Sequence, residues 1–296
     1  MEPDISVIIP SYNADPALMR ILYDSLLRQH LQNFEVIIVD DASNDGAAYD
    51  FILDSRFRIL HQSENRGPAI CRNLGAKAAA SDCLFFTDTD CELEADTLME
   101  AVDGLQGGAI LAGNTVTRVV SPFGKAVALL GFPGGGLLGF DKVWRVDEEG
   151  YTASFSSCNL AFRKIIFETL GGFDTSFPVA GGEDTVLAWH AIQSGVRIRY
   201  RPAMRVYHIE KNTFRDFKAW QLVRGRGNYH IKRRVDHVGG YLKLRVWTFT
   251  NSFRAAGLRY TLPVLCLLCF SVYYQVKGMF LEKRAMKKRQ EKSAVD

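Results

Sequence analysis

The sequence predicts an α/β fold in which a mixed, mostly parallel sheet is flanked by helices and followed by a helical tail. In the first hundred residues, apolar segments of strand length alternate with helical segments, as expected for a parallel sheet covered by helices. The strand segments are almost continuously apolar, which is typical of strands buried on both faces. Residues 1–210 carry 17 Lys+Arg and 28 Asp+Glu, whereas residues 211–296 carry 19 and 5. We therefore expect an acidic body over 1–210 and a basic tail over 211–296.

The first half of the body alternates strands and helices. Strands are expected at residues 5–9, 34–39, 57–60 and 83–86. Helices are expected at about 16–30, 47–53 and 69–80. Asp15 and Pro16 mark the first helix start, because Asp caps helix N-termini and Pro is favoured at the first helical position. This alternation places the carboxyl ends of the strands along one edge of the sheet.

The second half of the body is less regular. Strands are expected at residues 110–120, 155–162, 196–200 and 205–208, and helices at 164–170 and 183–193. Glycines follow both helices and would end them. The segment 123–140 is apolar and rich in glycine, and it is either a mobile loop over the site or a segment that touches a membrane. It is not a phosphate loop, because it lacks the terminal Lys-Ser/Thr of that motif.

The tail has the character of a membrane-associating segment. Phe214, Phe217 and Trp220 recur at helical spacing among basic residues, so this amphipathic helix lies on a membrane or packs on the body. The uncharged run 260–276 then spans a bilayer, lies in one leaflet or forms a buried core helix. Basic residues after it favour the cytoplasmic side of a membrane, with the chain peripheral or held by a single span. The apolar run favours lipid over nucleic acid as the anionic partner.

Cysteine usage and the N-terminus suggest a reducing compartment. The six cysteines show no zinc-type paired spacing, and Cys266 and Cys269 lie inside an apolar run, where we expect packing rather than metal or redox chemistry. No disulfide is required. The first residues are acidic and the apolar segment 5–9 is too short for a signal peptide, so none is expected.

Polar residues follow three of the predicted strands where each one ends. They are Ser11-Tyr12-Asn13, Asp40-Asp41 and Asp88-Thr89-Asp90. Because these strands run in parallel, the three groups are expected on one rim. Residues i and i+2 of an extended chain project to the same side, so Asp88 and Asp90 can converge on one divalent cation. Such a cation is usually completed by phosphate oxygens, which indicates a phosphate-bearing ligand.

Five segments, in order, resemble family 2 glycosyltransferases, which have the Rossmann-like GT-A fold. The resemblance covers roughly residues 4–210. The matching segments are 6–13 (SVIIPSYN), 36–45 (VIIVDDASND), 65–76 (NRGPAICRNLGA), the DxD segment 87–90 (TDTD), and 171–174 (GGFD) with 182–184 (GED). The resemblance implies transfer of a sugar from a nucleoside diphosphate sugar.

The resemblance also implies roles for individual residues. Asp90 would bind Mg²⁺ or Mn²⁺, with Asp88 contacting the ribose or the ion, and His208 would be a further metal ligand. Asp40 or Asp41 would accept a hydrogen bond from the base. The remaining residues on the donor side are Pro10, Tyr12, Asn13, Arg66 and Arg72, of which Arg66 and Arg72 are candidates for the diphosphate or the base. For Arg72 the alternative is a cation on a helix surface.

Attack by an acceptor hydroxyl requires a base opposite the leaving group, and Asp184 is the candidate, with Glu183 beside it. Both lie at a helix start, where the helix dipole is expected to lower the pKa of a carboxyl group and weaken it as a base. Helix capping is the alternative role for the pair. A single displacement of this kind inverts the anomeric centre.

Departures from the family pattern narrow the prediction. Processive relatives carry a Gln/Arg-x-x-Arg-Trp motif, but residues 221–227 read QLVRGRG, without that Trp. Nor are there the several spanning helices of a polymer-exporting synthase. We therefore expect transfer of one sugar to a lipid-linked or envelope-glycan acceptor. The alternatives are a nucleotidyltransferase, which would need a glycine-rich phosphate loop after the first strand, and a non-catalytic, membrane-anchored sugar-nucleotide-binding protein, which would not need Asp90 or Asp184.

Overall fold

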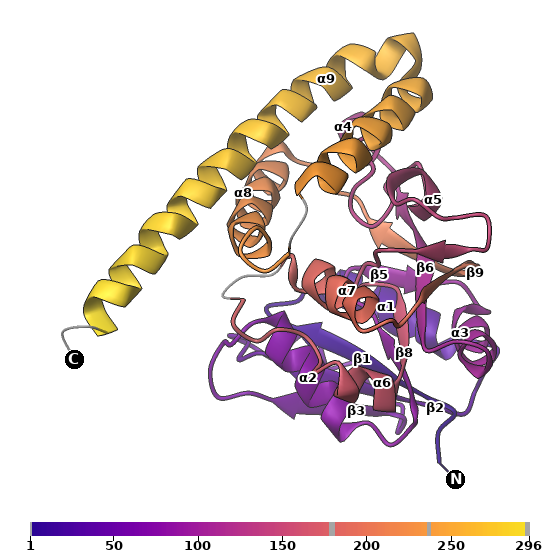
Figure 1. Cartoon of the computed structure of the whole chain (residues 1–296). Helices are drawn as coiled ribbons and strands as arrows, with labels where there is room; N and C mark the ends of the chain where they lie inside the picture. The colour runs from indigo at the N-terminus through magenta and orange to yellow at the C-terminus, as the bar shows by residue number, and fades with distance from the viewer. Residues whose placement is uncertain (1, 178–180, 236–237, 294–296) are drawn as a thin grey trace.

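A computed structural model describes residues 2–177, 181–235 and 238–293. One mixed sheet forms the centre of the molecule, helices cover both of its faces, and two long helices follow at the C-terminal side (Figure 1). The strand order is β3-β2-β1-β4-β8-β6-β9-β5, and β7 pairs with β9. The strands are β1 (Ile5–Ser11), β2 (Phe34–Asp40), β3 (Phe57–His61), β4 (Cys83–Phe86), β5 (Cys91–Leu93), β6 (Ile110–Arg118), β7 (Tyr151–Thr152), β8 (Leu160–Arg163) and β9 (Ile198–Ile209).

The N-terminal half of the sheet is parallel. β1 pairs in parallel with β2 and β4, and β2 pairs in parallel with β3. Ser11 at the end of β1 lies opposite Asp40 at the end of β2, and β4 ends two residues before Asp88. The predicted convergence of these polar strand ends on one rim is therefore confirmed.

The C-terminal half of the sheet is mixed. β8 lies antiparallel between β4 and β6, and β9 runs parallel to β6. β5 pairs with β9 in antiparallel fashion, in a register that sets Cys91 opposite His208. This pairing brings the end of the DxD segment against the end of β9, more than a hundred residues away in sequence.

Two apolar layers cover the sheet. On one face, helices α1 (Pro16–Leu27) and α3 (Thr97–Gln106) bury Leu22, Leu26 and Leu98 in one apolar cluster with residues of the sheet. On the other face lie α2 (Pro68–Ala78), α6 (Lys164–Thr169) and α7 (Glu183–Gln193). α2 and α7 both begin at the polar rim. Burial of their apolar faces therefore also fixes the positions of the residues at their N-termini.

Four predicted elements differ from the structure. Residues 47–53 do not form a helix, because the Tyr49 hydroxyl donates to Asp40 Oδ1 at 2.9 Å and lies 2.8 Å from Ser11 Oγ, which holds the short segment on the sheet. The strand predicted at 155–162 covers only Leu160–Arg163, and turns precede it. The strands predicted at 196–200 and 205–208 are one strand, β9, with an irregularity in its pairing opposite Gly113 and Asn114.

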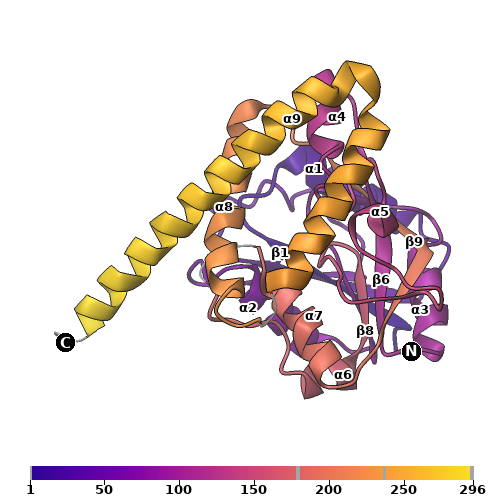
Figure 2. The same cartoon turned by 45° about the horizontal axis from the view of Figure 1, so that its top comes forward.

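The tail helices pack on the body. α8 (Phe214–Ile231) buries Phe217 fully, which favours packing on the body over lying on a membrane for this helix. α9 (Val238–Ser293) bends at Gly257, whose φ is 59°, and Figures 1 and 2 show its two halves meeting at this bend. The first half is held on the short helix α5 (Phe140–Val143), because Thr248 Oγ1 donates to Val143 O at 3.0 Å.

A third apolar cluster joins the tail to the segment predicted as a loop or a membrane contact. Residues 122–128 form helix α4, and the glycine-rich turn follows it. Val127 and Leu130 from this segment pack with Phe217 of α8 and with Val264 and Leu267 of α9. The segment 123–140 thus packs against the tail, and its glycine-rich part also lines the pocket described below.

Candidate active site

A pocket of about 330 Å³ lies at the rim, between the body and the tail. Body residues that line it include Arg72, Asp88, Glu183, Asp184 and His208. The glycine-rich turn contributes Phe132, Pro133 and Gly134. The turn before β8 contributes Phe155, Ser156, Ser157 and Cys158. The strand prediction over 155–162 is therefore wrong for residues 155–158, which form one wall of the pocket.

A buried arginine links two carboxylates at the floor of the pocket. Arg72 of α2 donates to Asp88 Oδ1 at 2.7 Å and to Glu183 Oε1 at 2.9 Å, and its side chain is only 4% exposed. Burial alone would lower the pKa of Arg72, but Asp88 and Glu183 more than offset this effect and raise it. Arg72 is therefore permanently charged and is not a surface cation. It ties the DxD segment to the start of α7.

Asp184, next to Glu183, has a different environment. Its Oδ1 accepts from the backbone N of Thr185 at 2.7 Å. Burial, followed by the charge of Glu183, raises the pKa of Asp184 to about 6. The expectation that the helix start lowers this pKa is wrong, because desolvation and a like charge outweigh the helix dipole. Asp184 is accordingly a stronger base than an exposed aspartate.

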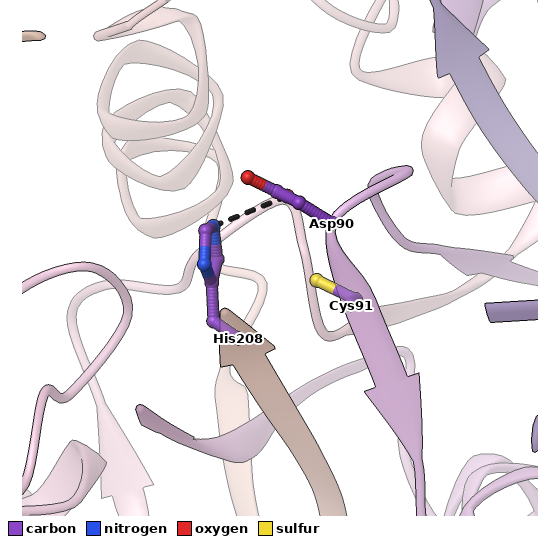
Figure 3. A group of neighbouring side chains, drawn as sticks. All are labelled: Asp90, Cys91 and His208. Atoms are coloured by element: carbon purple, nitrogen blue, oxygen red, sulfur yellow. Dashed lines mark ion pairs between the residues drawn. The ribbon is translucent and has the colours of Figure 1, made fainter. Parts of the chain in front are cut away.

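Asp90, Cys91 and His208 form a second group of side chains, shown in Figure 3, whose ligand atoms lie within 4.8 Å of one another. His208 Nε2 lies 3.3 Å from Asp90 Oδ1, and Lys211 Nζ lies 3.2 Å from Asp90 Oδ2. Burial alone would raise the pKa of Asp90, but His208 and Lys211 more than offset this effect and lower it. The carboxylate is thus charged and directed at a histidine nitrogen.

This group fits a divalent cation. His208 Nδ1 is 2.8 Å from Ile209 O, so Nδ1 carries a proton and Nε2 is the nitrogen that faces Asp90. A carboxylate oxygen together with an imidazole nitrogen suits Mn²⁺ or Mg²⁺ with further oxygen ligands from a substrate. A hydrogen bond with Cys158, and then burial, raises the pKa of the Cys91 thiol, which favours its neutral form. Sequence reasoning did not single out Cys91, although it follows Asp90 directly.

The structure pairs Asp88 with Arg72 and groups Asp90 with His208 and Cys91. A single cation shared by Asp88 and Asp90 therefore stays a prediction.

Asp40 and Asp41 already have hydrogen-bond partners within the chain. Asp40 accepts from the Tyr49 hydroxyl at 2.9 Å and lies 3.0 Å from His61 Nδ1. Asp41 accepts from the backbone N of Arg66 at 2.8 Å and of Gly67 at 2.7 Å. Both carboxylates hold the loops at the rim in place, and which of them contacts a base stays open.

The other predicted donor-side residues lie at the neighbouring strand ends. Tyr12 is half exposed, and the backbone N of Asn13 donates to Ser43 Oγ at 2.8 Å. The Arg66 side chain is largely exposed and lies 3.8 Å from Glu64. Of the predicted donor-side residues, Arg72 and Asp88 line the pocket, and Pro10, Tyr12, Asn13, Asp40, Asp41 and Arg66 are not among its lining residues.

The tail supplies pocket residues that the sequence prediction missed. Trp220, Arg224 and Asn228 of α8 line the pocket, as does Arg245 of α9. The Arg224 guanidinium carbon lies 4.0 Å from the centroid of the Phe132 ring, and that of Arg245 lies 4.8 Å from the same centroid. The signal was present, because positions 220, 224 and 228 share one face of a helix. From the sequence alone, the aromatic and basic pattern of this helix fits either a membrane contact or packing on the body.

Comparisons with known proteins point to one family. Residues 6–169 match the family model described as glycosyl transferase family 2. The pre-mycofactocin glycosyltransferase of Mycobacterium tuberculosis is 28% identical over 227 residues, which cover 73% of this chain and 45% of that protein. The succinoglycan biosynthesis protein ExoO of Rhizobium meliloti is 28% identical over 228 residues, covering 71% of this chain and 62% of that protein. The chain thus spans less than two thirds of these relatives.

Solved structures share the fold. The mannosyltransferase PcManGT of Pyrobaculum calidifontis, in complex with GDP-Man and Mn²⁺, superposes with a TM-score of 0.60 at 21% identity, covering 95% of this chain and 87% of that one. GalNAc-T7 with UDP, GalNAc and Mn²⁺ gives a TM-score of 0.55 at 14% identity, covering 87% and 57%. The mixed sheet with flanking helices is therefore of the GT-A type, as predicted.

Proposed function

Because this chain belongs to glycosyl transferase family 2, we propose that it moves a single sugar from a nucleoside diphosphate sugar to a hydroxyl of a lipid-linked or envelope-glycan acceptor, with inversion. Sugar transfer from a nucleotide sugar follows from the family. The acceptor, the stereochemistry and the residue roles are the proposed part. The observation that carries the proposal is Asp184, a partly buried carboxylate that lines the pocket beside Glu183, where desolvation and the charge of Glu183 raise its pKa to about 6.

On the donor side, Asp90 and His208 would hold Mg²⁺ or Mn²⁺. The bound cation would stabilise the charge of the departing diphosphate as a Lewis acid. Arg72 holds Asp88 and Glu183 in place at the pocket floor, between the donor side and the start of α7. The Mn²⁺ and nucleotide ligands named for the two solved neighbours support this assignment.

On the acceptor side, Asp184 would take the proton of the acceptor hydroxyl while the oxygen of that hydroxyl forms a bond to the anomeric carbon. The diphosphate leaves from the opposite face, which inverts that centre. Glu183 is occupied by Arg72 and by the backbone N of Gly181, at 2.9 and 2.7 Å. Glu183 therefore acts by orienting Arg72 and by raising the pKa of Asp184, and Asp184 is the base.

Aromatic side chains in the pocket wall, one from the tail and one from the body, support a glycan acceptor. The Trp220 and Trp144 rings line the pocket, and aromatic faces provide apolar surface for the CH groups of sugars. Relatives named for succinoglycan and O-antigen biosynthesis point to the same class of acceptor. A single apolar helix long enough to span a membrane, found among the described residues, is weak support for an acceptor reached at the cytoplasmic side of a membrane.

A screen of purified protein against nucleoside diphosphate sugars, with Mn²⁺ or Mg²⁺, tests the proposal. Diphosphate release is measured with and without detergent-solubilised lipid acceptors. We expect metal-dependent turnover of one donor, lost in Asp90→Ala and Asp184→Asn. Donor binding without turnover across the acceptor panel, unchanged by Asp184→Asn, would favour the non-catalytic alternative. Absence of donor binding by folded protein with metal would contradict the proposal.

A further inference from the structure

The second half of α9 presents an exposed apolar stripe. Large apolar side chains recur at spacings of three and four residues, which places them on one face of the helix. Leu258, Leu262, Val272, Val276 and Phe280 are between 46% and 101% exposed. Leu265, Cys269 and Tyr273 belong to the same face and are also exposed. We call this set the α9 stripe. Most soluble surfaces do not carry an apolar patch of this length.

An apolar groove adjoins the stripe. It has a volume of about 470 Å³ and lies between α4, the start of α8 and α9. Phe123, Phe214, Pro263, Leu267 and Phe270 line it, and Arg259 lies among the lining residues. A concave apolar surface beside a cationic side chain suits a hydrocarbon chain next to an anionic headgroup.

Basic side chains border the stripe. Arg259 and Lys277 lie beside it, and Lys283, Arg284 and Lys287 continue the same helix beyond its apolar part. All five are exposed. Apolar side chains flanked by Lys and Arg on a helix are typical of a segment that lies in the interface of an anionic membrane.

The opposite face of α9 is fixed to the body by polar contacts. Ser271 Oγ donates to Gln221 Oε1 at 2.8 Å, and Asn228 Nδ2 donates to Gln275 Oε1 at 2.9 Å. Further along, Glu282 is fully buried and accepts from Arg226 Nε at 2.7 Å. These contacts hold α9 against α8, which itself lines the pocket.

A spanning orientation is incompatible with these contacts. If residues 260–276 crossed a bilayer with α8 still attached, Lys218, whose Nζ lies 5.8 Å from the Tyr274 ring centroid, and the neighbouring Arg224 would have to enter the hydrocarbon or its boundary. Charged side chains are costly at that depth. The bilayer therefore meets only the free face of α9.

We propose that the α9 stripe and the adjoining groove dock this protein on an anionic lipid surface, with α9 lying in the plane of the membrane and not across it. The apolar side chains enter the boundary between headgroups and acyl chains, and the flanking Lys and Arg contact headgroups. The proposal concerns where the chain sits and does not depend on the proposed transfer reaction.

Depth-dependent fluorescence quenching tests the orientation. Cys266 and Cys269 are exposed, whereas Cys71, Cys83, Cys91 and Cys158 are buried, so surface labelling is selective. In a Cys266→Ser background, the full chain is labelled at Cys269. In a background with both exposed cysteines replaced by Ser, it is labelled after Leu262→Cys or Val276→Cys. Vesicles contain phosphatidylcholine and phosphatidylglycerol, with spin labels at shallow or deep acyl positions.

An in-plane helix predicts the same shallow quenching at positions 262, 269 and 276. In a spanning helix these positions would differ in depth by about 20 Å, because the helix rises about 1.5 Å per residue. A depth gradient along the three positions would overturn the in-plane orientation. Ile165→Cys in the same background, on the exposed face of α6, is the control that should show no quenching.

Vesicle flotation tests the lipid partner. The double variant Leu262→Ser with Phe280→Ser should weaken binding to phosphatidylglycerol vesicles at least about tenfold, because two exposed apolar side chains are lost. The matched variant Leu53→Ser with Ile165→Ser removes equally exposed side chains from the body and should bind normally. Binding should be weaker to phosphatidylcholine alone and at high salt. Failure to bind vesicles, or self-association through the stripe in light scattering, would overturn the proposal.

Discussion

At the scale of single residues, the burial of Asp184 determines how the proposed transfer depends on pH. Burial and the charge of Glu183 raise the pKa of Asp184 to about 6, and a base works only when deprotonated. We expect kcat to rise with pH up to about 6 and to level off above it. Asp184→Asn should lower kcat by about 10²–10⁴ and remove this pH dependence. Initial rates across pH with saturating donor measure both effects. A normal rate in Asp184→Asn would assign the base elsewhere.

Arg72 is expected to contribute to the free energy of unfolding as well as to the geometry of the pocket. Arg72→Met leaves Asp88 and the buried Glu183 without their cation, and breaking a buried pair in this way costs about 3–5 kcal/mol. Urea unfolding should show a loss of this size. Arg66→Met is the control, because its side chain is exposed and should change the free energy of unfolding by less than about 0.5 kcal/mol. Equal losses in both variants would contradict this account.

At the scale of elements, close approach of α8 and α9 depends on glycine. A Cβ at Gly225 would lie 2.1 Å from Gln275 O, a backbone atom that cannot rotate away. Gly225→Ala should therefore push the helices apart and cost about 1–3 kcal/mol, as overpacking does. Because α8 also lines the pocket, the KM for acceptor should rise. Gly46→Ala is the control, since its Cβ would meet nothing within 4 Å. Unfolding curves and acceptor titrations of the two variants provide the measurement.

Most body elements follow from sequence periodicity, and the failures have local physical causes. The parallel strands were predictable because their apolar runs are continuous and bounded by polar residues. Residues 47–53 have helical composition, yet Tyr49 is anchored by Ser11 and Asp40, which a single-sequence pattern does not show. The break before Leu160 was missed because residues 155–162 are apolar enough for a strand.

The pocket residues from the body could be anticipated better than those from the tail. Asp88, Asp184 and His208 lie at or next to element ends, so topology alone gathers them. Trp220 and Arg245 reach the pocket only because the tail folds back on the body, which depends on long-range packing. Residues of the basic, aromatic pattern of α8, which left a membrane contact and packing on the body open, also line the pocket.

At the scale of the whole molecule, donor and metal should stabilise the fold together. Arg72, Asp88, Asp90 and His208 come from three separate elements, namely α2, the DxD segment after β4, and β9, so a ligand that contacts them links these elements. A ligand at a hundred times its Kd adds about 2.7 kcal/mol. We expect the correct nucleoside diphosphate to raise the Tm with Mn²⁺ and much less after chelation. In Asp90→Ala the Mn²⁺-dependent part should be absent, and its persistence would place the cation elsewhere.

The tail carries both the proposed acceptor wall and the proposed membrane-docking surface, and variants on its two faces should separate these two proposals. The pocket face of α8 carries Trp220, whereas the free face of α9 carries Leu262 and Phe280. Trp220→Ala should raise the KM for any glycan acceptor, because the aromatic wall is lost whether or not a membrane is present. Leu262→Ser with Phe280→Ser should leave turnover of a soluble acceptor unchanged and lower turnover only when the acceptor is embedded in vesicles. Initial rates with matched soluble and embedded acceptors measure the difference. If both variants lowered turnover of the soluble acceptor equally, the stripe would belong to the catalytic body and not to a membrane-docking surface.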